Sequence, residues 1–546
     1  MKKPLRMARF TFDLLRYVMS EFNPLEITFD DDATWDLICS GRTKGVFQLE
    51  SNLGRSWSKR VQPRDIEELS ALISIIRPGT LKAIVDGKSM TQHFVDRKNG
   101  IEEITYLHPS LEPILKATQG VLVYQEQSMQ ITQQLAGFDL QEADNLRKAI
   151  GKKKADLMAQ VKESFLKGAS KEAIVSNEIA EEVFSWIEKS SRYAFNKSHA
   201  VSYAICAYWS AYAKIHHPLE FYCNYLLHSS GKPDPQQEVK ELVNDAKNID
   251  IHINPPSLKA MNVQTDIIDG QICFGFLDVK TVGLKQVEKF KEAIKKGEEA
   301  CDKPFIEWSW YEFLILVSSS CNSRMVIALI SIGFFSNFSG SRQNMLDELD
   351  TWSNTTKKEQ QWAVDNYKKF EDLVSLLKAM APTKKLGGST FNLRRSQVLL
   401  DLVIQCENPS YSLKDDSEWV IRTEENYLGV ALTYSRVEVY NTSLANTTIK
   451  EFISGKRGNI KMAVSISDVK KYVTKRGKMK GVEMAFICAE DHTGTIDTIT
   501  VFAEKWKEHK TVLYKGNNVI LKGQDSRNIR HQIDDGFIVE DVIELS

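Results

Sequence analysis

The sequence predicts an α+β chain of several domains, in which a mainly helical N-terminal part is followed, after less regular segments, by a small C-terminal β-barrel. The 546 residues are too many for one hydrophobic core, and the length favours roughly three to five domains. Apolar residues recur at helical spacing in the N-terminal part, as at Ile131, Leu135 and Phe138. From Lys461 the apolar pattern changes to a period of two, which is typical of strands.

Helical segments separated by turn residues account for residues 46–228. Turn dipeptides such as Pro78-Gly79 and Asn99-Gly100 divide this stretch. In front of it, residues 1–45 carry a short strand-like run at 8–12 and then a helical pattern. We therefore expect a short mixed segment and then a helical domain.

The middle of the chain is less regular. Loop-like Asn254-Pro255-Pro256-Ser257 follows the helical domain. Two helical segments with glycine punctuation come next, one after residues 275–283 and one at 325–332. Residues 346–455 are polar and mixed, and their pattern indicates only a connector.

Period-two runs after Lys461 predict about five strands. Turn residues at 476–477, 492–494 and 515–516 separate the runs. Short strands at this spacing are typical of a small barrel, and an OB-fold is the natural candidate. The alternating apolar residues are Met462, Val464, Ile466, Met484, Phe486, Cys488, Ile499, Val501, Val519 and Leu521.

Composition limits the class of protein. Hydrophobic residues make up 42% of the chain and charged residues 26%, which is ordinary for a globular protein. No apolar run reaches the roughly 18 residues of a membrane span, and no signal peptide is recognisable, so we expect no membrane and a cytoplasmic location. The eight cysteines form no Cys-x-x-Cys pair, which argues against a zinc site and against a disulfide framework.

The formal net charge of -1 excludes only a wholly basic nucleic-acid binder. Charge effects are screened within about 8 Å at physiological salt, so local patches decide binding. Positive charge is concentrated at Gly151-Lys152-Lys153-Lys154 and at Lys475-Arg476-Gly477-Lys478. Nucleic acid therefore remains a candidate partner.

The segment from Arg192 to Tyr203 is the strongest functional signal in the sequence. Within a dozen residues it holds aromatic rings, an amide, an ammonium, hydroxyls and an imidazole. Burying this mixture costs about 1 kcal/mol or more for each unpaired polar group. A nucleotide or nucleic-acid site can use all of these groups.

Phe195-Asn196-Lys197-Ser198-His199 resembles, nearly letter for letter, a motif of the family C polymerases, the bacterial DNA polymerase III alpha subunits. Other segments resemble the same family in the family's order, and the resemblance covers roughly residues 8–345 and 424–525. These segments are Gly45-Val46-Phe47-Gln48-Leu49-Glu50-Ser51, Arg77-Pro78-Gly79, Phe94-Val95-Asp96-Arg97-Lys98-Asn99-Gly100, Val123-Tyr124-Gln125-Glu126-Gln127 and Leu146-Arg147-Lys148-Ala149-Ile150-Gly151.

The resemblance implies the C-terminal portion of such a subunit, an α+β multidomain chain. It implies a helix-hairpin-helix region at residues 229–345 that binds DNA or a clamp. The backbone amides of the hairpin would hold the phosphates of a duplex. Thr281 stands where the family has the first glycine of this hairpin. The implied parts are a palm remnant and connector (1–45), mainly helical fingers that close over the incoming nucleotide (46–228), a helix-hairpin-helix region (229–345), a connector (346–455) and an OB-fold domain (456–546).

Arg147 and Lys148 are candidate nucleotide-binding residues. The resemblance puts Arg147 in the place of an arginine that contacts the phosphates of the nucleotide. Lys148 replaces a second arginine and lacks the planar fork of a guanidinium. The alternative is a solvated basic helix end that the helix dipole favours.

Four residues of the 192–203 segment are candidates for nucleotide or primer contact. An aromatic ring can stack on a base, an amide can bond a base edge or a sugar, and an ammonium can neutralise a phosphate. The candidates are Tyr193, Asn196, Lys197 and His199, and the alternative for the histidine is a structural role.

Further basic residues are candidate contacts to the DNA backbone. The alternative for each is an ordinary charge on a surface helix or a solvated hairpin. In the barrel, basic residues near an aromatic ring suit single-stranded template. The candidates are Arg77, Arg97, Lys98, Lys152, Lys153, Lys475, Arg476, Lys478 and Tyr472.

Gln397-Val398-Leu399-Leu400-Asp401-Leu402 resembles the Gln-x-x-Leu-x-Leu peptide with which polymerases dock in a sliding clamp. Gln397, Leu400 and Leu402 are the matching positions, so a clamp is a candidate partner. An amphipathic core helix gives the same spacing and is an equal alternative.

The metal-binding residues of a polymerase are the missing part. Nucleotidyl transfer uses two divalent metal ions held by aspartates, which the family supplies from its palm. An ungapped match to the palm of the family places Thr11 at one of its catalytic aspartate positions. Asp13 lies two residues further on, on the same face of the strand, and is a weak candidate for a catalytic residue. We expect no complete metal site here, and Mg²⁺ held mainly by a partner chain.

The sequence thus predicts the C-terminal part of a split replicative DNA polymerase. It would bind dNTP and primer-template DNA, act as an enzyme only together with a palm-bearing chain, and suit a bacterial virus. The alternative is a non-catalytic DNA-binding replication subunit or an inactivated paralogue.

Overall fold

The computed structural model describes residues 23–152, 155–190, 193–381, 393–409, 411–474, 480–525 and 536–545, without the side chains at 150–152, 155, 393 and 498. Helices predominate, and five strands near the C-terminus form a closed barrel, so the predicted α+β class is confirmed. The contacts divide the chain into two compact units, with the boundary between Phe221 and Tyr222. The predicted five-part division is finer than this and stays a prediction.

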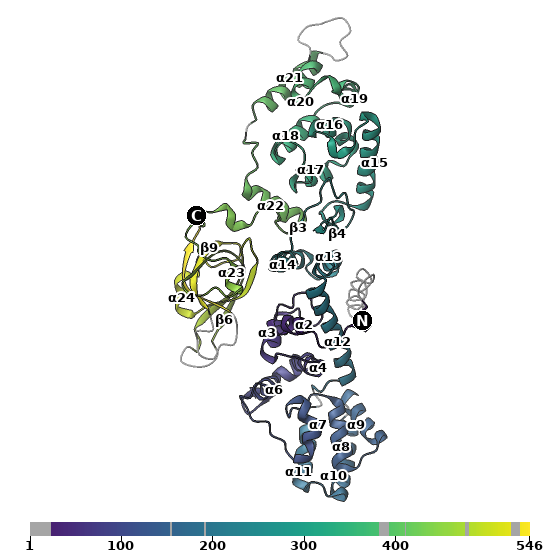
Figure 1. Cartoon of the computed structure of the whole chain (residues 1–546), viewed down its shortest axis with the longest axis vertical. Helices are drawn as coiled ribbons and strands as arrows, with labels where there is room; N and C mark the ends of the chain where they lie inside the picture. The colour runs from purple at the N-terminus through teal and green to yellow at the C-terminus, as the bar shows by residue number, and fades with distance from the viewer. Residues whose placement is uncertain are drawn as a thin grey trace. The chain divides into compact units, whose positions relative to one another are not determined.

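The described residues of the first unit are mainly helical, with one small hairpin among them (Figure 1). The hairpin consists of β1 (Ile84–Val85) and β2 (Lys88–Ser89). The helices are α2 (Asp32–Ser40), α3 (Asn52–Val61), α4 (Ile66–Ile75), α5 (Pro78–Lys82), α6 (Met90–Lys98), α7 (Glu112–Leu115), α8 (Gln125–Ala136), α9 (Leu140–Lys152), α10 (Ala155–Glu172), α11 (Asn177–Ser190) and α12 (Lys197–His216); the unit boundary falls within α13 (Pro218–His228).

Short polar side chains start many of these helices. Asp31, Ser51, Asp65, Ser89 and Asn196 each precede a helix, and each accepts a hydrogen bond from the backbone N–H three residues later. Such N-caps satisfy a backbone donor that the helix itself leaves without a partner. The local sequence therefore sets where α12, which carries the candidate motif, begins.

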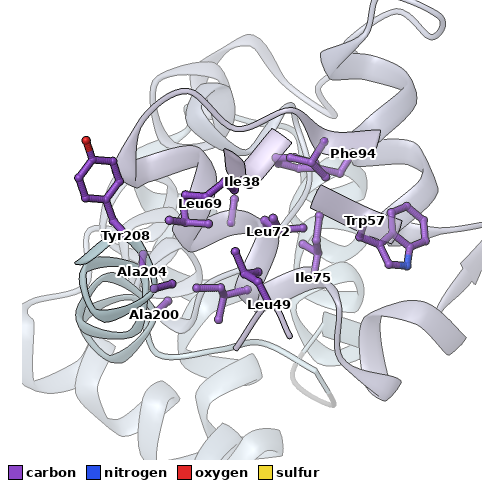
Figure 2. Packing of buried hydrophobic residues seen from close by; sticks show 14 of the residues in the cluster. Ile38, Leu49, Trp57, Leu69, Leu72, Ile75, Phe94, Ala200, Ala204 and Tyr208 are labelled. Atoms are coloured by element: carbon purple, nitrogen blue, oxygen red, sulfur yellow. The ribbon is translucent and has the colours of Figure 1, made fainter. Parts of the chain in front are cut away.

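One hydrophobic core of the first unit forms where α12 packs against α4 and α2 (Figure 2). Ala200, Ala204, Ala207 and Ala211 are fully buried and recur on one face of α12. Side chains this small let two helix backbones approach closely. The core includes residues of α2, within the segment that the sequence analysis assigns to a palm remnant and connector.

A second core holds α8, α10 and α11 together with the short α7 (Figure 1). Phe165 lies at its centre, with its ring centroid 5.3 Å from that of Phe184 and 6.3 Å from that of Phe138. This rigid group of helices carries α9, on which Arg147 and Lys148 lie.

The second unit begins with helices, a three-stranded sheet and further helices, and ends in the barrel. Its helices are α14 (Pro235–Lys247), α15 (Leu284–Cys301), α16 (Trp310–Leu316), α17 (Ser323–Ser331), α18 (Arg342–Ser353), α19 (Lys357–Asn366), α20 (Leu373–Met380), α21 (Leu393–Glu407), α22 (Ser417–Leu428), α23 (Ile449–Ile453) and α24 (Ala503–His509). The three-stranded sheet is β3 (Ile253–Asn254), β5 (Gln271–Cys273) and β4 (Asp266–Ile268).

The predicted hairpin before α15 has an unusual backbone at Thr281. This residue has φ = 72°, in the left-handed region that glycine adopts freely and β-branched residues avoid. Gly283 follows as the N-cap of α15. The fold thus keeps the backbone that a glycine would favour at Thr281, and the binding of DNA by this hairpin stays a prediction.

The barrel consists of β6 (Ile460–Val473), β7 (Glu483–Glu490), β8 (Thr495–Val501), β9 (Asn518–Asp525) and β10 (Phe537–Glu544). All neighbouring strands are antiparallel except β8 and β10, and the long β6 closes the barrel by pairing with β7 and with β9. With α24 between the third and fourth strands, this is the connectivity expected of an OB-fold.

The face of β7 that points into the barrel core is not the one that the alternation of large residues predicts. Ala485, Ile487 and Ala489 line the core, whereas Phe486 is exposed. A β-bulge between Ile487 and Ala489 interrupts the pairing with β8. Period two located the strand, but small alanines fill the narrow interior and the larger ring of Phe486 lies outside.

Candidate functional site

The candidate motif lies where an irregular segment leads into α12. Phe195 forms a bridge to the segment before α8: its N–H donates to the carbonyl of Val123, and its carbonyl accepts from the N–H of Gln125, both at 2.9 Å. These two bonds fix the backbone just ahead of Asn196. The motif is therefore held between two helix starts, those of α8 and α12.

Asn196 uses its whole amide to hold this junction. Its Oδ1 accepts from the His199 N–H at 2.9 Å and from the Ser198 hydroxyl at 2.6 Å. Its Nδ2 donates to Oε1 of Glu126 at 2.8 Å. Asn196, predicted to contact the nucleotide or primer, therefore positions the start of α12 in this structure.

Glu126, which belongs to the matching segment Val123-Tyr124-Gln125-Glu126-Gln127, holds the start of α12. Besides the amide of Asn196, it accepts the backbone N–H of Lys197 through Oε2 at 2.9 Å. A carboxylate at a helix N-terminus is stabilised by the helix dipole. Glu126 thus ties the first turn of α8 to the first turn of α12.

An aromatic row runs from the loop before α3 along α12 and consists of Phe47, Tyr203, His199 and Phe195. Successive ring centroids are 5.0, 4.1 and 5.4 Å apart. Three of the rings are half-buried, and His199 is exposed. Ring faces of this kind can stack on nucleobases.

The loop that carries Phe47 is tied to α12. The N–H of Phe47 donates to the hydroxyl of Ser210 at 3.0 Å. The ammonium of Lys214 donates to the carbonyls of Arg42 and Lys44, both at 2.9 Å. These bonds hold one end of the aromatic row in place.

Tyr193 lies beside the row but serves the core. Its ring packs against the core between α4 and α12. Burial raises the pKa of its hydroxyl to about 12. In this structure Tyr193 therefore offers less of its ring to a ligand than His199 does.

Lys197 is on the surface and already carries a counter-ion. Its Nζ lies 3.0 Å from Oε1 of Glu67 and 5.8 Å from the ring centroid of Tyr124. Both partners of the ion pair are exposed, so the pair contributes little stability and a ligand phosphate can compete for the ammonium.

Arg147 and Lys148 share a single carboxylate. The guanidinium of Arg147 and the ammonium of Lys148 contact the two oxygens of Asp144 at 2.7 and 2.8 Å. Hydrogen bonds from Lys148 and Arg147 lower the pKa of Asp144. Both cations are exposed on α9, where phosphate could replace Asp144 as their partner.

Arg97 and Lys98 have structural partners. Arg97 donates to Oε1 of Glu102 at 2.8 Å and to the carbonyl of Gln119 at 3.2 Å, and Lys98 pairs with Glu68. Their side chains are only 15% and 13% exposed. Despite burial, hydrogen bonds from His93 and Arg97 hold the pKa of Glu102 down to about 2. The geometry therefore favours a structural role for both cations over the predicted DNA contact.

The barrel presents an aromatic pair on its outer surface. Tyr472 is 40% exposed and Phe486 39%, with their ring centroids 6.1 Å apart. The sequence analysis selected Tyr472 but missed Phe486 as its neighbour. The cross-strand pairing of Tyr472 with Met484 and of Lys470 with Phe486 brings the two rings together.

Several predicted residues cannot be placed. Asp13, Lys153, Lys475, Arg476 and Lys478 lie outside the described residues. Lys152 is the last residue of α9, and its side chain also falls outside them. Their assignments stay predictions.

The candidate clamp peptide is part of α21. Leu402 is buried, Leu400 is half-buried, and the exposed amide of Gln397 donates to Asp401 at 3.0 Å. The helix packs on α20. This geometry favours the alternative of an amphipathic packed helix, because Leu402 would have to leave the core to dock in a clamp.

The described residues do not provide a polymerase metal site. Within them, the one group of three possible ligands is Glu508, His509 and Asp541, whose ligand atoms lie within 4.8 Å of one another. This group belongs to the barrel and includes a histidine, whereas the polymerase chemistry needs aspartates beside the nucleotide. This group therefore does not match a two-metal polymerase centre. Within the same part of the chain, no helix is long and apolar enough to cross a membrane.

Comparison with known proteins supports the resemblance stated above. Residues 5–173 match the model of the bacterial DNA polymerase III alpha subunit finger domain. This match starts and ends earlier than the predicted fingers at 46–228, and it leaves the 192–203 segment outside.

Curated relatives extend the match over most of the chain. The DNA polymerase III subunit alpha of Bacillus subtilis is 30% identical over 505 residues, which are 91% of this chain and 40% of that protein. The corresponding subunit of Aquifex aeolicus is 37% identical over 328 residues, 60% of this chain and 27% of that protein. That of Escherichia coli K12 is 30% identical over 524 residues, 92% of this chain and 41% of that protein.

The chain spans about two fifths of the length of the Bacillus and Escherichia relatives. The ordered motifs, the helical first unit and the terminal barrel agree with these matches. The chain belongs to the bacterial DNA polymerase III alpha subunit family, of which it represents a C-terminal-like portion.

Proposed function

We propose that this chain supplies the nucleotide- and DNA-binding parts of a replicative DNA polymerase whose palm is carried by a separate chain. The observation that carries the proposal is the aromatic row along α12, a series of neighbouring rings on the helix that begins with the charged residue Lys197. Bases and phosphates occur together in dNTPs and in DNA, and both groups find partners there. The relatives are named as polymerase subunits, which supports the same assignment.

The proposed roles follow from the contacts. His199 and Tyr203 offer ring faces to a base or sugar, while Lys197 offers charge to a phosphate. Asn196 and Glu126 keep this set in register by fixing the start of α12. Tight positioning of this kind lowers the entropy cost of holding a reactant in line.

Arg147 and Lys148 are proposed to bind the triphosphate. Because Asp144 holds both cations in the absence of ligand, nucleotide binding would exchange one anion for another. The ion pairs with Asp144 would keep both cations oriented until the nucleotide binds. Solvent screens these ion pairs, so the carboxylate of Asp144 would compete only weakly with a triphosphate for the two cations.

The barrel is proposed to follow single-stranded template. Tyr472 and Phe486 give an aromatic platform, and the connection between β6 and β7 contains Lys475, Arg476 and Lys478. OB-folds use this connection and the neighbouring strands to bind oligonucleotides. The magnesium ions of the reaction would be held mainly by the palm-bearing chain.

The proposal is tested by nucleotide dependence. In the enzyme assembled with a palm-bearing partner, Arg147→Ala and Lys197→Ala should raise the apparent nucleotide requirement about tenfold or more, while duplex binding changes less. Lys167→Ala is the matched control, since this exposed lysine forms an ion pair with Glu163 in the preceding turn of α10. Wild-type nucleotide kinetics in both variants would contradict the assignment of these residues.

A non-catalytic DNA-binding subunit is the second candidate. One observation favours it: Arg147, Lys148 and Lys197 are all neutralised by carboxylates of this chain. This candidate predicts DNA binding that dNTP neither strengthens nor alters. A dNTP-dependent gain in primer-template affinity, measured with the assembled proteins, would exclude it.

A further inference from the structure

Arg77 is the one cation among the predicted site residues of the described part of the chain that lacks a carboxylate partner. Arg147, Lys148 and Lys197 each pair with an acidic side chain, as do Arg97 and Lys98. The guanidinium of Arg77 instead lies over an aromatic ring, with its Cζ 3.7 Å from the ring centroid of Phe195.

The position of Arg77 is fixed on two sides. The next residue is Pro78, which restricts Arg77 to extended backbone, and the observed φ and ψ are -99° and 153°. The side chain is held by Phe195, whose own backbone bonds to the segment before α8. The orientation of the guanidinium is therefore set before any ligand binds.

The surroundings of Arg77 leave its charge uncompensated. The side chain is half-buried, and this burial lowers the pKa of the guanidinium. Partial burial of a cation without an anion is unfavourable for the folded protein. Within the described residues the guanidinium makes the ring contact with Phe195 but no hydrogen bond or ion pair, so its N–H donors stay available.

We infer that Arg77, held on Phe195 at the end of the aromatic row, is a preformed phosphate-binding residue. A guanidinium edge matches two phosphate oxygens at once, and a ligand phosphate would supply the missing counter-charge without displacing a carboxylate. The ring of Phe195 that carries Arg77 is also the neighbour of His199 in the aromatic row, with ring centroids 5.4 Å apart. The inference rests on the proposed function for its choice of probes: the phosphate belongs either to the triphosphate of a nucleotide or to the DNA backbone.

The test measures binding by the full-length chain, without catalysis. Inorganic tripolyphosphate is the first probe, and a primer-template duplex over a range of salt concentrations is the second. The variants are Arg77→Gln, which removes the charge; Arg77→Lys, which keeps the charge without the planar fork; and Phe195→Leu, which removes the ring. Arg64→Gln is the matched control, because Arg64 is an exposed arginine of the same unit paired with Asp36.

The expected result for Arg77→Gln is a loss of about tenfold in affinity for one probe, with Arg64→Gln unchanged. If only the affinity for tripolyphosphate falls, Arg77 binds the triphosphate of a nucleotide. Loss confined to the duplex, with the salt slope reduced by about one, assigns the DNA backbone. Arg77→Lys and Phe195→Leu should lose less affinity, and for the same probe. If Arg77→Gln does not fold, these two variants provide the test.

Affinity within twofold of wild type in both arms for all three folded variants would overturn the inference. So would an equal loss in Arg64→Gln, which would show a nonspecific charge effect. The outcome is separable from that of the proposed function. If the Arg77 variants lose affinity, the inference holds even when the assembled proteins extend no primer. If the assembled proteins extend primers but the Arg77 variants bind both probes as the wild type does, only the inference is wrong.

Discussion

Asn196 shows how a residue with the chemistry of a ligand contact can serve the scaffold. Its amide accepts from the His199 N–H and the Ser198 hydroxyl and donates to Glu126, so both its oxygen and its nitrogen are engaged in this structure. The sequence shows that polar groups and rings are concentrated in this segment. It could not predict which of them were already engaged, since Glu126 is separated from Asn196 by 70 residues.

At this residue, Asn196→Ala should lower the free energy of unfolding by about 1–2 kcal/mol, because the N-cap of α12 and the bond to Glu126 are both lost. Chemical denaturation of the full chain measures the change. Ser202→Ala is the control: this exposed hydroxyl bonds only back to the Ser198 carbonyl within α12. Equal stability of Asn196→Ala and wild type would show that the cap is dispensable.

Glu102 gives a prediction about acid stability. Its pKa is about 2 in the folded protein against an ordinary value of 4.5, because bonds from His93 and Arg97 outweigh burial. A carboxyl group with a lowered folded pKa stabilises the fold above its unfolded pKa and loses that contribution as the pH falls. Stability should therefore decrease between pH 4.5 and pH 2.

Glu102→Gln should flatten this decrease, and it should lower stability at neutral pH. Thermal unfolding followed across the pH range measures both effects. Glu163→Gln removes an exposed carboxylate paired only with Lys167 and serves as the control. If Glu102→Gln followed the wild-type pH profile, the network around Glu102 would contribute nothing to acid stability.

Among the elements, α8 and α10 pack unusually closely at Gly168. A Cβ atom there would lie 2.2 Å from the carbonyl oxygen of Ala136, which is rigid backbone. Gly168→Ala should therefore destabilise the first unit by about 1–3 kcal/mol, although alanine favours helices. Gly231→Ala, where nothing lies within 4 Å, should be close to neutral. A stabilised Gly168→Ala would contradict the close packing.

The two faces of β7 give a second element-scale prediction. Ile487→Ala should cost about 2–5 kcal/mol because the side chain is fully buried in the barrel. Phe486→Ala should leave stability nearly unchanged and weaken binding of single-stranded oligonucleotide, with little change in the salt slope. Denaturation and fluorescence anisotropy measure these effects. Unaltered oligonucleotide binding in folded Phe486→Ala would remove this ring from the platform.

The elements also show the limits of the sequence patterns. Period two located the barrel strands, and the five-stranded closure was confirmed, but the pattern of large residues pointed to the wrong face of β7. The reason is physical: a small barrel has room for Ala485 and Ala489 inside, so size does not report burial. In α21, apolar spacing alone could not separate a clamp peptide from a packed helix, and the burial of Leu402 favours the helix.

For the whole molecule, ordered motifs predicted the family, because several matching segments in sequence are specific even when each is short. Charge assignments were less predictable. Arg97, Lys98 and Arg77 look alike in the sequence, yet the first two are paired with Glu102 and Glu68 and the third is stacked on Phe195. These differences depend on tertiary contacts that no local pattern encodes.

We propose that this chain contributes the nucleotide- and DNA-binding parts of a polymerase and that a palm-bearing chain contributes the metal-binding aspartates. The most direct measurement is magnesium-dependent primer extension by the purified chain, by a palm-bearing partner, and by the two together. The account predicts extension only with the mixture, and its loss when the aspartates of the partner are replaced. Robust extension by the purified chain alone would contradict it.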